Sequence, residues 1–308
     1  MHNHSHDHDH GHGHVHADPS TVPQGAFIAG IALNGIYVIV QVITGFMTNS
    51  MALLSDAGHN LSDVAALALS LFAFRLAKMK PTQSFTYGYK KTTILAALTN
   101  AVVLLVAIGM MAYESITRLI HPEPVQGGIV AWVAGLGIVI NSVSALLFFR
   151  SKDHDVNTKG AYLHLLTDAM VSLGVVISGI VVYYTGWYIM DAIVSLVVLL
   201  IILKGTWGLM KDSLRLSLDA VPANVNTEEI TGLIKKIKGV LDIHHVHIWA
   251  MSTTENALTT HVVLDTNLDF EEKMKVVHNI KHELQHHGIQ HATIELESAK
   301  TPCHDEEC

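Results

Sequence analysis

The chain has 308 residues, of which half are apolar and only 15% are charged, and its mean hydropathy is positive. Soluble globular domains carry about 25% charged residues, so this composition excludes an ordinary soluble protein and indicates a membrane protein. Acidic residues outnumber basic ones by 27 to 19, and the sequence has no basic patch with interleaved aromatic residues, which argues against a nucleic-acid partner.

The first 24 residues form a histidine-rich arm. Histidine occupies every even position from His2 to His16, where a cleavable signal would have a basic start and an apolar core. Such a segment is too polar to fold alone, and we interpret it as a cytoplasmic zinc reservoir. An expression tag is the alternative, but the interspersed Asp, Gly and Ser residues favour a native arm.

Apolar runs fill residues 25–210, which we predict to be a transmembrane domain. Six runs are long enough to cross the roughly 30 Å hydrocarbon layer of a bilayer, and helix is the state that satisfies their backbone there. The runs are Gly25–Met47, Met51–Leu76, Thr92–Ile116, Ile129–Phe149, Tyr162–Thr185 and Ile189–Met210.

Basic residues predict the orientation, because they are concentrated in the cytoplasmic loops of membrane proteins. They flank the second and fourth connections: Arg75, Lys78, Lys80, Lys90, Lys91, Arg150, Lys152 and Lys159. We therefore expect these loops and both termini to be cytoplasmic, in a multi-pass protein of the cell inner (plasma) membrane.

After Met210 the pattern becomes that of a soluble domain, at residues 211–298, followed by a tail at 299–308 that holds Cys303 and Cys308. The periodicity predicts helices and strands in the order α-β-β-α-β. Their ranges are Thr227–Lys238, Val240–Met251, Leu258–Asp265, Phe270–His287 and Ile289–Glu297. The predicted fold is thus six transmembrane helices and a ferredoxin-like α+β domain, whose open sheet face suits a homodimer.

Two apolar runs carry ionisable residues, which cost roughly 2.5–3.5 kcal/mol each inside a membrane and so indicate function. In the second run, Asp56, His59 and Asp63 follow one helical stripe. In the fifth run, His164 and Asp168 are one turn apart, the same spacing as His59 and Asp63.

Two imidazoles and two carboxylates are the donor set of a tetrahedral Zn²⁺ site, and the carboxylates balance the charge of the ion. Metal binding requires deprotonated ligands, so protons compete with the metal for the same atoms. The sequence therefore predicts Zn²⁺ export in exchange for H⁺ across the lipid bilayer, with no catalytic residues.

Other readings are open for these residues. A single His-x-x-x-Asp pair in a soluble helix is more often a surface ion pair. A membrane-embedded zinc enzyme would need an open coordination position and a general base, whereas four protein ligands favour a carried ion. A zinc sensor would explain the soluble domain but not six spans.

The chain resembles the cation diffusion facilitators, in particular the bacterial zinc and cadmium exporters. The motifs that carry the resemblance are "LLSDAGHNLSD", "GAYLHLLTD", "HHVHIWAM" and "HATIELES". The resemblance implies a homodimer, Zn²⁺/H⁺ exchange through His59, Asp63, His164 and Asp168, and a cytoplasmic domain that binds further zinc. Histidine on both helices favours zinc, with Cd²⁺ or Co²⁺ as alternatives.

The resemblance also bears on two loops. It implies that Lys90 or Lys91 contacts Asp219 at the membrane edge. Some relatives bind a metal between the second and third helices, but Thr82–Tyr89 contains no His, Asp, Glu or Cys, so we expect no metal there.

In the soluble domain, the resemblance favours a set of zinc ligands near strand ends and in the tail. Zinc accepts such a mixture of nitrogen, oxygen and sulfur. The candidate ligands are His244, His261, His291, Glu297, Cys303 and Cys308, whereas His245 and His282 are expected at the surface. For each of these histidines, a solvated strand residue is the alternative.

Overall fold

A computed structural model describes residues 24–149 and 156–299, with side chains from residue 34 on except at 66, 67, 70, 71, 147–149 and 156–164. The histidine-rich arm, Cys303, Cys308 and the side chain of His164 therefore lie outside the described residues. The chain divides into two compact units, Met1–Leu71 with Ala97–Met210 and Phe72–Ala96 with Lys211–Cys308.

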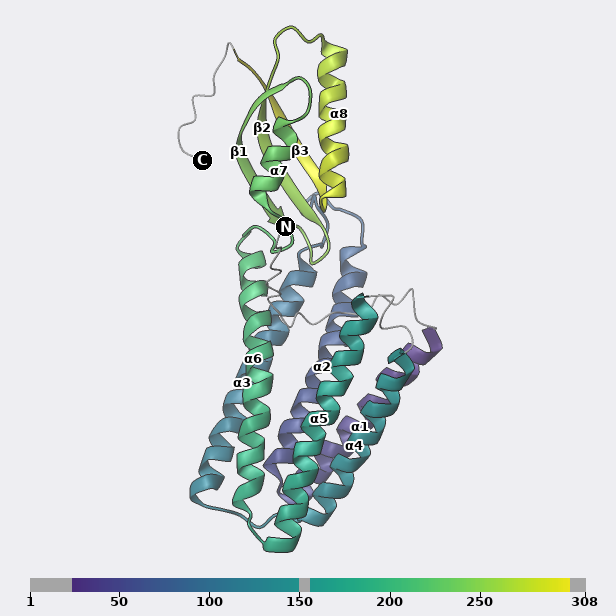
Figure 1. Ribbon diagram of the computed structural model, residues 1–308, viewed down its shortest axis with the longest axis vertical. Coiled ribbons are helices and arrows are strands. Elements are labelled where there is room, and N and C mark those ends of the chain that lie inside the picture. The colour runs from purple at the N-terminus through teal and green to yellow at the C-terminus, as the bar shows by residue number, and fades with distance from the viewer. Residues whose placement is uncertain (1–23, 150–155, 300–308) are drawn as a thin grey trace, which may run out of the picture. The chain divides into compact units, whose positions relative to one another are not determined.

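The chain begins with six long helices (Figure 1). They are α1 (Gln24–Thr48), α2 (Met51–Ala77), α3 (Thr92–Ile120), α4 (Gly127–Phe149), α5 (Val156–Thr185) and α6 (Ile189–Ser217). Within the described residues, α3 to α6 are long and apolar enough to cross a bilayer. The prediction of an α-helical membrane protein is confirmed, and spans by α1 and α2 stay a prediction.

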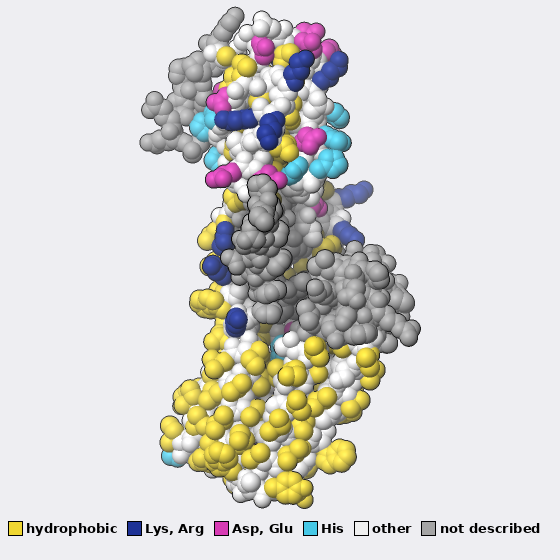
Figure 2. All heavy atoms as spheres, viewed as in Figure 1, with side chains coloured by type: hydrophobic (Ala, Val, Ile, Leu, Met, Phe, Trp, Pro, Cys, Tyr) yellow, Lys and Arg dark blue, Asp and Glu magenta, His cyan; other side chains and the backbone are white. Residues whose placement is uncertain are grey.

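Apolar side chains cover the visible face of the helical unit (Figure 2). Large exposed examples come from several helices: Phe46, Met110, Trp132, Leu146 and Tyr184. In water such a surface would drive association, but in lipid it is the expected exterior.

Polar contacts from α6 fix the start of α2. The carboxylate of Asp191 accepts hydrogen bonds from the Ser50 hydroxyl and from the backbone amides of Met51 (2.6 Å) and Ala52 (3.2 Å). These amides are among the four at a helix start that have no partner within the helix, and a negative charge there is stabilising.

One turn further along, hydroxyls join three helices. Ser195 of α6 lies 2.7 Å from both Ser55 of α2 and Ser115 of α3, measured between the Oγ atoms. All three residues are fully buried, so each hydroxyl needs such a partner.

Glycines allow α4 and α5 to pack closely. A Cβ atom on Gly179 would lie 2.7 Å from the Ala131 nitrogen and 2.7 Å from the Gly127 oxygen, closer than real Cβ contacts. In membrane bundles, packing of this kind replaces the hydrophobic driving force, which lipid largely removes.

We therefore expect Gly179→Ala to destabilise the bundle by about 1–3 kcal/mol, the usual cost of overpacking. Gly174→Ala on the same helix is the matched control, because its Cβ would meet only Val194 Cγ1, at 3.9 Å. Thermal unfolding in detergent measures both, and equal melting temperatures would contradict the proposed close contact.

The second unit contains a three-stranded sheet with strand order β1-β2-β3. Its elements are α7 (Thr227–Lys235), β1 (Val240–Ala250), β2 (Asn256–Leu264), α8 (Phe270–His286) and β3 (Ile289–Ser298). β1 and β2 are antiparallel, whereas β2 and β3 are parallel and joined by α8. The predicted α-β-β-α-β order is confirmed.

Side chains from both helices and all three strands share one core. It includes Ile234 of α7, Leu258 of β2, Ile280 and Leu284 of α8, and Ile289 of β3. The helices also have the expected caps: Asn226 caps α7, and Asp269 with Glu272 forms a capping box on α8.

Two ion pairs link the start of α3 to the rest of this unit. Lys91 binds the carboxylate of Asp219, which confirms the predicted contact, and Lys90 binds that of Glu255. Asp219 has a left-handed backbone, with φ of 59°. Because these side chains are about one-third to one-half exposed, each pair contributes little stability and serves mainly to orient the chain.

Candidate metal centres

Three of the predicted transport ligands converge between α2 and α5. His59 Nε2 lies 3.0 Å from Asp168 Oδ1 and 4.0 Å from Asp63 Oδ2. One ligand atom from each residue lies within 4.8 Å of the other two, a spacing that one metal ion can span. The side chain of His164, one turn before Asp168, is outside the described residues.

The three side chains are well shielded from solvent: the exposed fraction is 15% for His59 and Asp63 and 3% for Asp168. Two carboxylates in such surroundings carry a large desolvation cost unless a cation, a proton or a hydrogen-bond donor compensates them. The arrangement therefore has high affinity for positive charge.

A third carboxylate, Asp56, lies on the same stripe of α2 but in a separate network. It accepts hydrogen bonds from Gln41 Nε2 at 2.6 Å and from the Ser172 hydroxyl at 3.2 Å. Gln41 also donates to the Tyr37 hydroxyl at 2.9 Å and accepts from Asn60 at 3.0 Å. These bonds tie α1 and α5 to the stretch of α2 that carries His59.

Asp56 is fully buried, and its hydrogen bonds come from α1 and α5. The sequence places Asp56 on the same helical stripe as His59 and Asp63 but indicates no role for it. Its contacts indicate that it positions α2, which holds the His59 side chain one turn away.

A second cluster lies on the sheet of the other unit. Register places His244 of β1 beside His261 of β2, and His261 beside Glu295 of β3. Glu297 reaches the same place, with its carboxylate 2.7 Å from His261 Nδ1 and 3.2 Å from His244 Nε2. Three of the predicted ligands, His244, His261 and Glu297, are therefore neighbours.

His245 joins this cluster, which the sequence did not predict. Strand alternation would turn it to the opposite face from His244, but the β1–β2 pairing is irregular between His244 and His247. His245 has φ of 49°, and its ring centroid lies 5.0 Å from those of both His244 and His261. The bulge therefore brings a third imidazole to the site.

The charge state of Glu297 suits metal binding. Burial by itself raises the pKa of this carboxyl group, but the hydrogen bond from His261 and the positive charges of His244 and His261 outweigh it, so the pKa is lowered. Glu297 is consequently ionised at neutral pH and available as a ligand.

His291 does not lie in this cluster. It pairs with Ala257 at the other end of β3. Six residues separate His291 from Glu297, which corresponds to about 20 Å at the usual rise of a strand. Its Nε2 atom is 3.4 Å from the Tyr87 hydroxyl, and the two rings meet edge to face. His291 is therefore not a neighbour of His244 and His261, and its role as a metal ligand stays a prediction. Cys303 and Cys308 lie outside the described residues.

Residues 27–216 match the family described as the cation efflux transmembrane domain, and residues 222–299 match the cation efflux protein cytoplasmic domain. The chain belongs to the cation efflux family. This family membership confirms the resemblance to cation diffusion facilitators.

Relatives within the cation efflux family cover nearly the whole chain. A Bacillus subtilis protein named cadmium, cobalt and zinc/H(+)-K(+) antiporter is 36% identical over 88% of each chain. The zinc transporter ZitB of Escherichia coli is 36% identical over 88% of this chain and 86% of its own. The metal cation efflux system protein CzcD of Cupriavidus metallidurans is 37% identical, over 89% and 85%.

The shared family and these relatives support metal cation efflux as the general activity. The names of these relatives describe transporters or efflux proteins.

We expect Glu297→Gln to remove zinc binding at the sheet cluster, because the amide has no negative charge and contacts both His244 and His261. Glu271→Gln is the control, since that carboxylate is exposed in the first turn of α8 and belongs to none of the ligand clusters of the described residues. Competition with a zinc chelator should count about one ion fewer per protomer only in Glu297→Gln. An unchanged count in that variant would exclude Glu297 as a ligand.

Proposed function

We propose that this protein exports Zn²⁺ from the cytoplasm in exchange for protons, through a tetrahedral site made by His59, Asp63, His164 and Asp168. The observation that carries the proposal is the convergence of His59, Asp63 and Asp168 between two apolar helices. His164 supplies the fourth ligand, from the helical turn before Asp168. Cd²⁺ and Co²⁺ are further candidate substrates. The name of the Bacillus subtilis relative includes cadmium and cobalt, and that of the Cupriavidus metallidurans relative refers to metal cations in general.

The proposed exchange follows from the charge of the site. With neutral imidazoles, the two carboxylates contribute two negative charges, which one Zn²⁺ balances. Without metal, protons fill this role, and histidine is the side chain that takes up protons near neutral pH. Zinc arriving from the cytoplasm displaces these protons, and protons arriving from outside displace zinc.

The proposal includes a homodimer in the inner membrane with both termini in the cytoplasm. Support for a dimer comes from the second family match, since that family is named ZT_dimer. Zinc bound by His244, His261 and Glu297 would tie the three strands together and serve as a regulatory ligand. The histidine-rich arm would raise the zinc concentration near the entrance.

Asp63→Asn and Asp168→Asn should each reduce zinc uptake into proteoliposomes to below about a tenth of wild type, because each removes a charged ligand. Glu114→Gln is a matched control: this carboxylate is on α3, and its partner is Arg118 on the same helix. Thermal unfolding of all three variants checks the fold. Wild-type rates in both aspartate variants would exclude the proposed site.

A pH gradient alone should drive zinc transport. With an acidic lumen and neutral buffer outside, protons leave the vesicle and zinc should accumulate inside against its own gradient. A zinc-sensitive dye in the lumen measures this, and replacing K⁺ by choline on both sides separates proton coupling from K⁺ coupling. Accumulation that persists after a protonophore collapses the pH gradient would contradict proton exchange.

A further inference from the structure

A basic segment joins α2 to α3. Residues 72–96 include five Lys or Arg residues and no Asp or Glu. Two of the lysines are held in the ion pairs with Glu255 and Asp219 described above. The other three basic residues are exposed and form no ion pair with any described residue: Arg75, Lys78 and Lys80. The segment therefore carries positive charge that the described part of the protein does not neutralise.

Large apolar side chains lie exposed in the loop between the two helices, residues 78–91, which we call the basic loop. Met79 is 53% exposed, Phe85 52% and Tyr87 51%. Exposed apolar side chains that gather in one segment commonly mark an interaction site. Aromatic rings beside lysines are typical of the headgroup level of a bilayer, where the apolar ring and the charged tip are both accommodated.

Hydrogen bonds hold the basic loop in a turn beside the start of α3. The Phe85 amide donates to Thr82 Oγ1 at 3.1 Å, and the Gly88 amide donates to the Phe85 oxygen at 2.8 Å. The Phe85 ring packs against that of Tyr89, with centroids 4.9 Å apart. Thr92, the first residue of α3, donates to the Tyr89 oxygen at 2.6 Å. Because α3 is long and apolar enough to cross a bilayer, Phe85 is held close to the membrane edge.

The end of α2 lies at the same level. Thr92 Oγ1 is 3.4 Å from the backbone oxygen of Ala73, so the last turns of α2 are beside the start of α3. Phe72 and Phe74 on these turns expose their rings, and the exposed Arg75 follows directly. The exterior of α2 thus changes from apolar to basic within about one turn, as expected where hydrocarbon gives way to headgroups.

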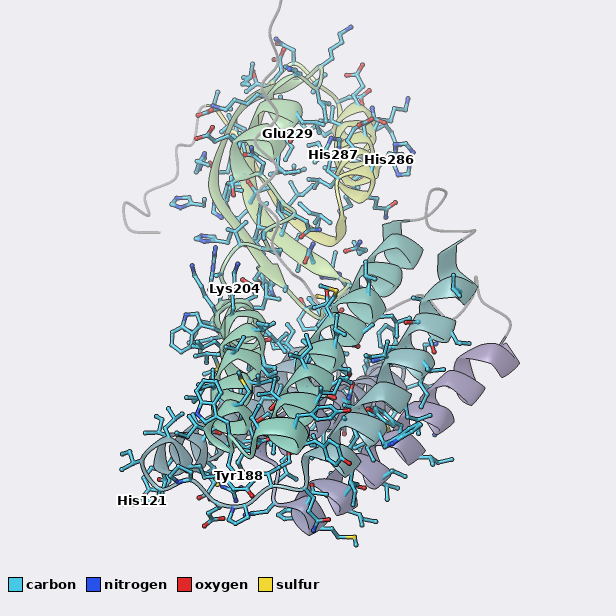
Figure 3. All side chains as sticks on the ribbon, turned by 60° about the horizontal axis from the view of Figure 1, so that its bottom comes forward. His121, Tyr188, Lys204, Glu229, His286 and His287 are labelled. Carbon is cyan, nitrogen blue, oxygen red and sulfur yellow. The ribbon has the colours of Figure 1, made fainter. Side chains whose placement is uncertain are left out.

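The same combination of lysine and aromatic ring occurs on α6. Lys204, labelled in Figure 3, is exposed, and Trp207 one turn later is 62% exposed. Like α3, α6 is long and apolar enough to cross a bilayer. A lysine on such a helix extends its charged end toward the headgroups, and an aromatic ring accompanies it here too.

Two other occupants fit the basic loop less well than lipid does. Water alone would suit the lysines but would leave Met79 and Phe85 exposed. A twofold contact with the same surface of a second copy would bury these apolar side chains but would bring like charges together. The anionic surface of a bilayer satisfies both kinds of side chain.

We propose that the basic loop and the last turns of α2 form a docking surface for anionic phospholipids of the bilayer that the chain spans. Arg75, Lys78 and Lys80 contact the headgroup phosphates, while Met79 and Phe85 insert between the headgroups. This docking surface is separate from all of the candidate metal ligands, and it does not depend on which ion the protein carries.

Lipid bound at this surface would also act on the soluble domain. Lys90 of the basic loop binds Glu255, which lies in the turn between β1 and β2. In the same turn, the Thr253 amide donates to the Thr93 hydroxyl at 3.1 Å. Lipid that holds the basic loop would therefore restrain this turn of the domain.

Photo-crosslinking in lipid nanodiscs tests the docking surface in the full-length protein. With p-benzoylphenylalanine in place of Phe85, mass spectrometry identifies the molecule that the probe captures. We expect a phospholipid adduct whose yield is at least about threefold higher in phosphatidylglycerol than in phosphatidylcholine, because basic side chains favour anionic lipid. High salt should reduce this preference, because it screens charges that are in contact with water.

Two further probe positions serve as controls. Trp132 is 83% exposed on the apolar exterior of α4, so the same probe there should capture both lipids equally well. Phe270 is 74% exposed at the start of α8 in the soluble domain, so the probe there should capture no lipid.

Removal of the positive charge should abolish the preference for anionic lipid. The test variant combines Arg75→Gln, Lys78→Gln and Lys80→Gln, and its yield in phosphatidylglycerol should fall to that in phosphatidylcholine. The control variant loses the same charge from three exposed lysines of the soluble domain, which also form no ion pair with any described residue: Lys236→Gln, Lys238→Gln and Lys275→Gln. Its yield should equal that of the chain with all six basic residues.

The proposal is overturned if the probe at Phe85 captures no lipid while the probe at Trp132 does, or if its yield is the same in both lipids. Equal losses in the two charge variants would also overturn it. Capture of a second copy of the chain, or of the tail at residues 299–308, in place of lipid would do so too.

Discussion

Two carboxylates held beside an imidazole inside an apolar bundle are the constraint on which the helical unit depends. Asp168 is almost fully buried and lies 3.0 Å from His59, while Asp63 is one turn from His59 on the same helix. Removing these charges from water is costly, and a cation, a proton or a hydrogen-bond donor at the same point offsets the cost. A bundle that keeps these two carboxylates together therefore favours a cation or protons beside them.

Much of the remaining polar structure in the bundle serves to hold α2 against its neighbours. Asp191 fixes its first turn, Ser195 bonds to Ser55, and Gln41 bonds to Asp56. Lipid offers helices little hydrophobic reason to associate, so such bonds and close glycine contacts carry the packing.

The second unit contains similar candidate ligands, but some of them are more exposed to solvent than those between α2 and α5. The cluster around His261 lies across the three strands of the sheet, where Glu295 is 67% exposed and water shares the cost of charge. Loss of a metal from this cluster would therefore be less costly than loss of positive charge from the buried site between α2 and α5, which suits the proposed regulatory role.

Sequence alone was sufficient to predict the six long helices, the α-β-β-α-β order and the one-turn separation of His59 and Asp63, because helical and strand periodicities are local properties of the chain. It also predicted the contact between Lys91 and Asp219, through the family resemblance. Helix ends were less predictable: α5 begins at Val156 and α6 continues to Ser217, since hydropathy reports only the part that lipid would cover. Tertiary structure decided which candidate ligands lie close together. Strand register places His244, His261 and Glu295 side by side, and a bulge turns His245 toward them. The distance along β3 keeps His291 apart. Register, bulge and distance are properties of the folded sheet and cannot be read from the type of each residue.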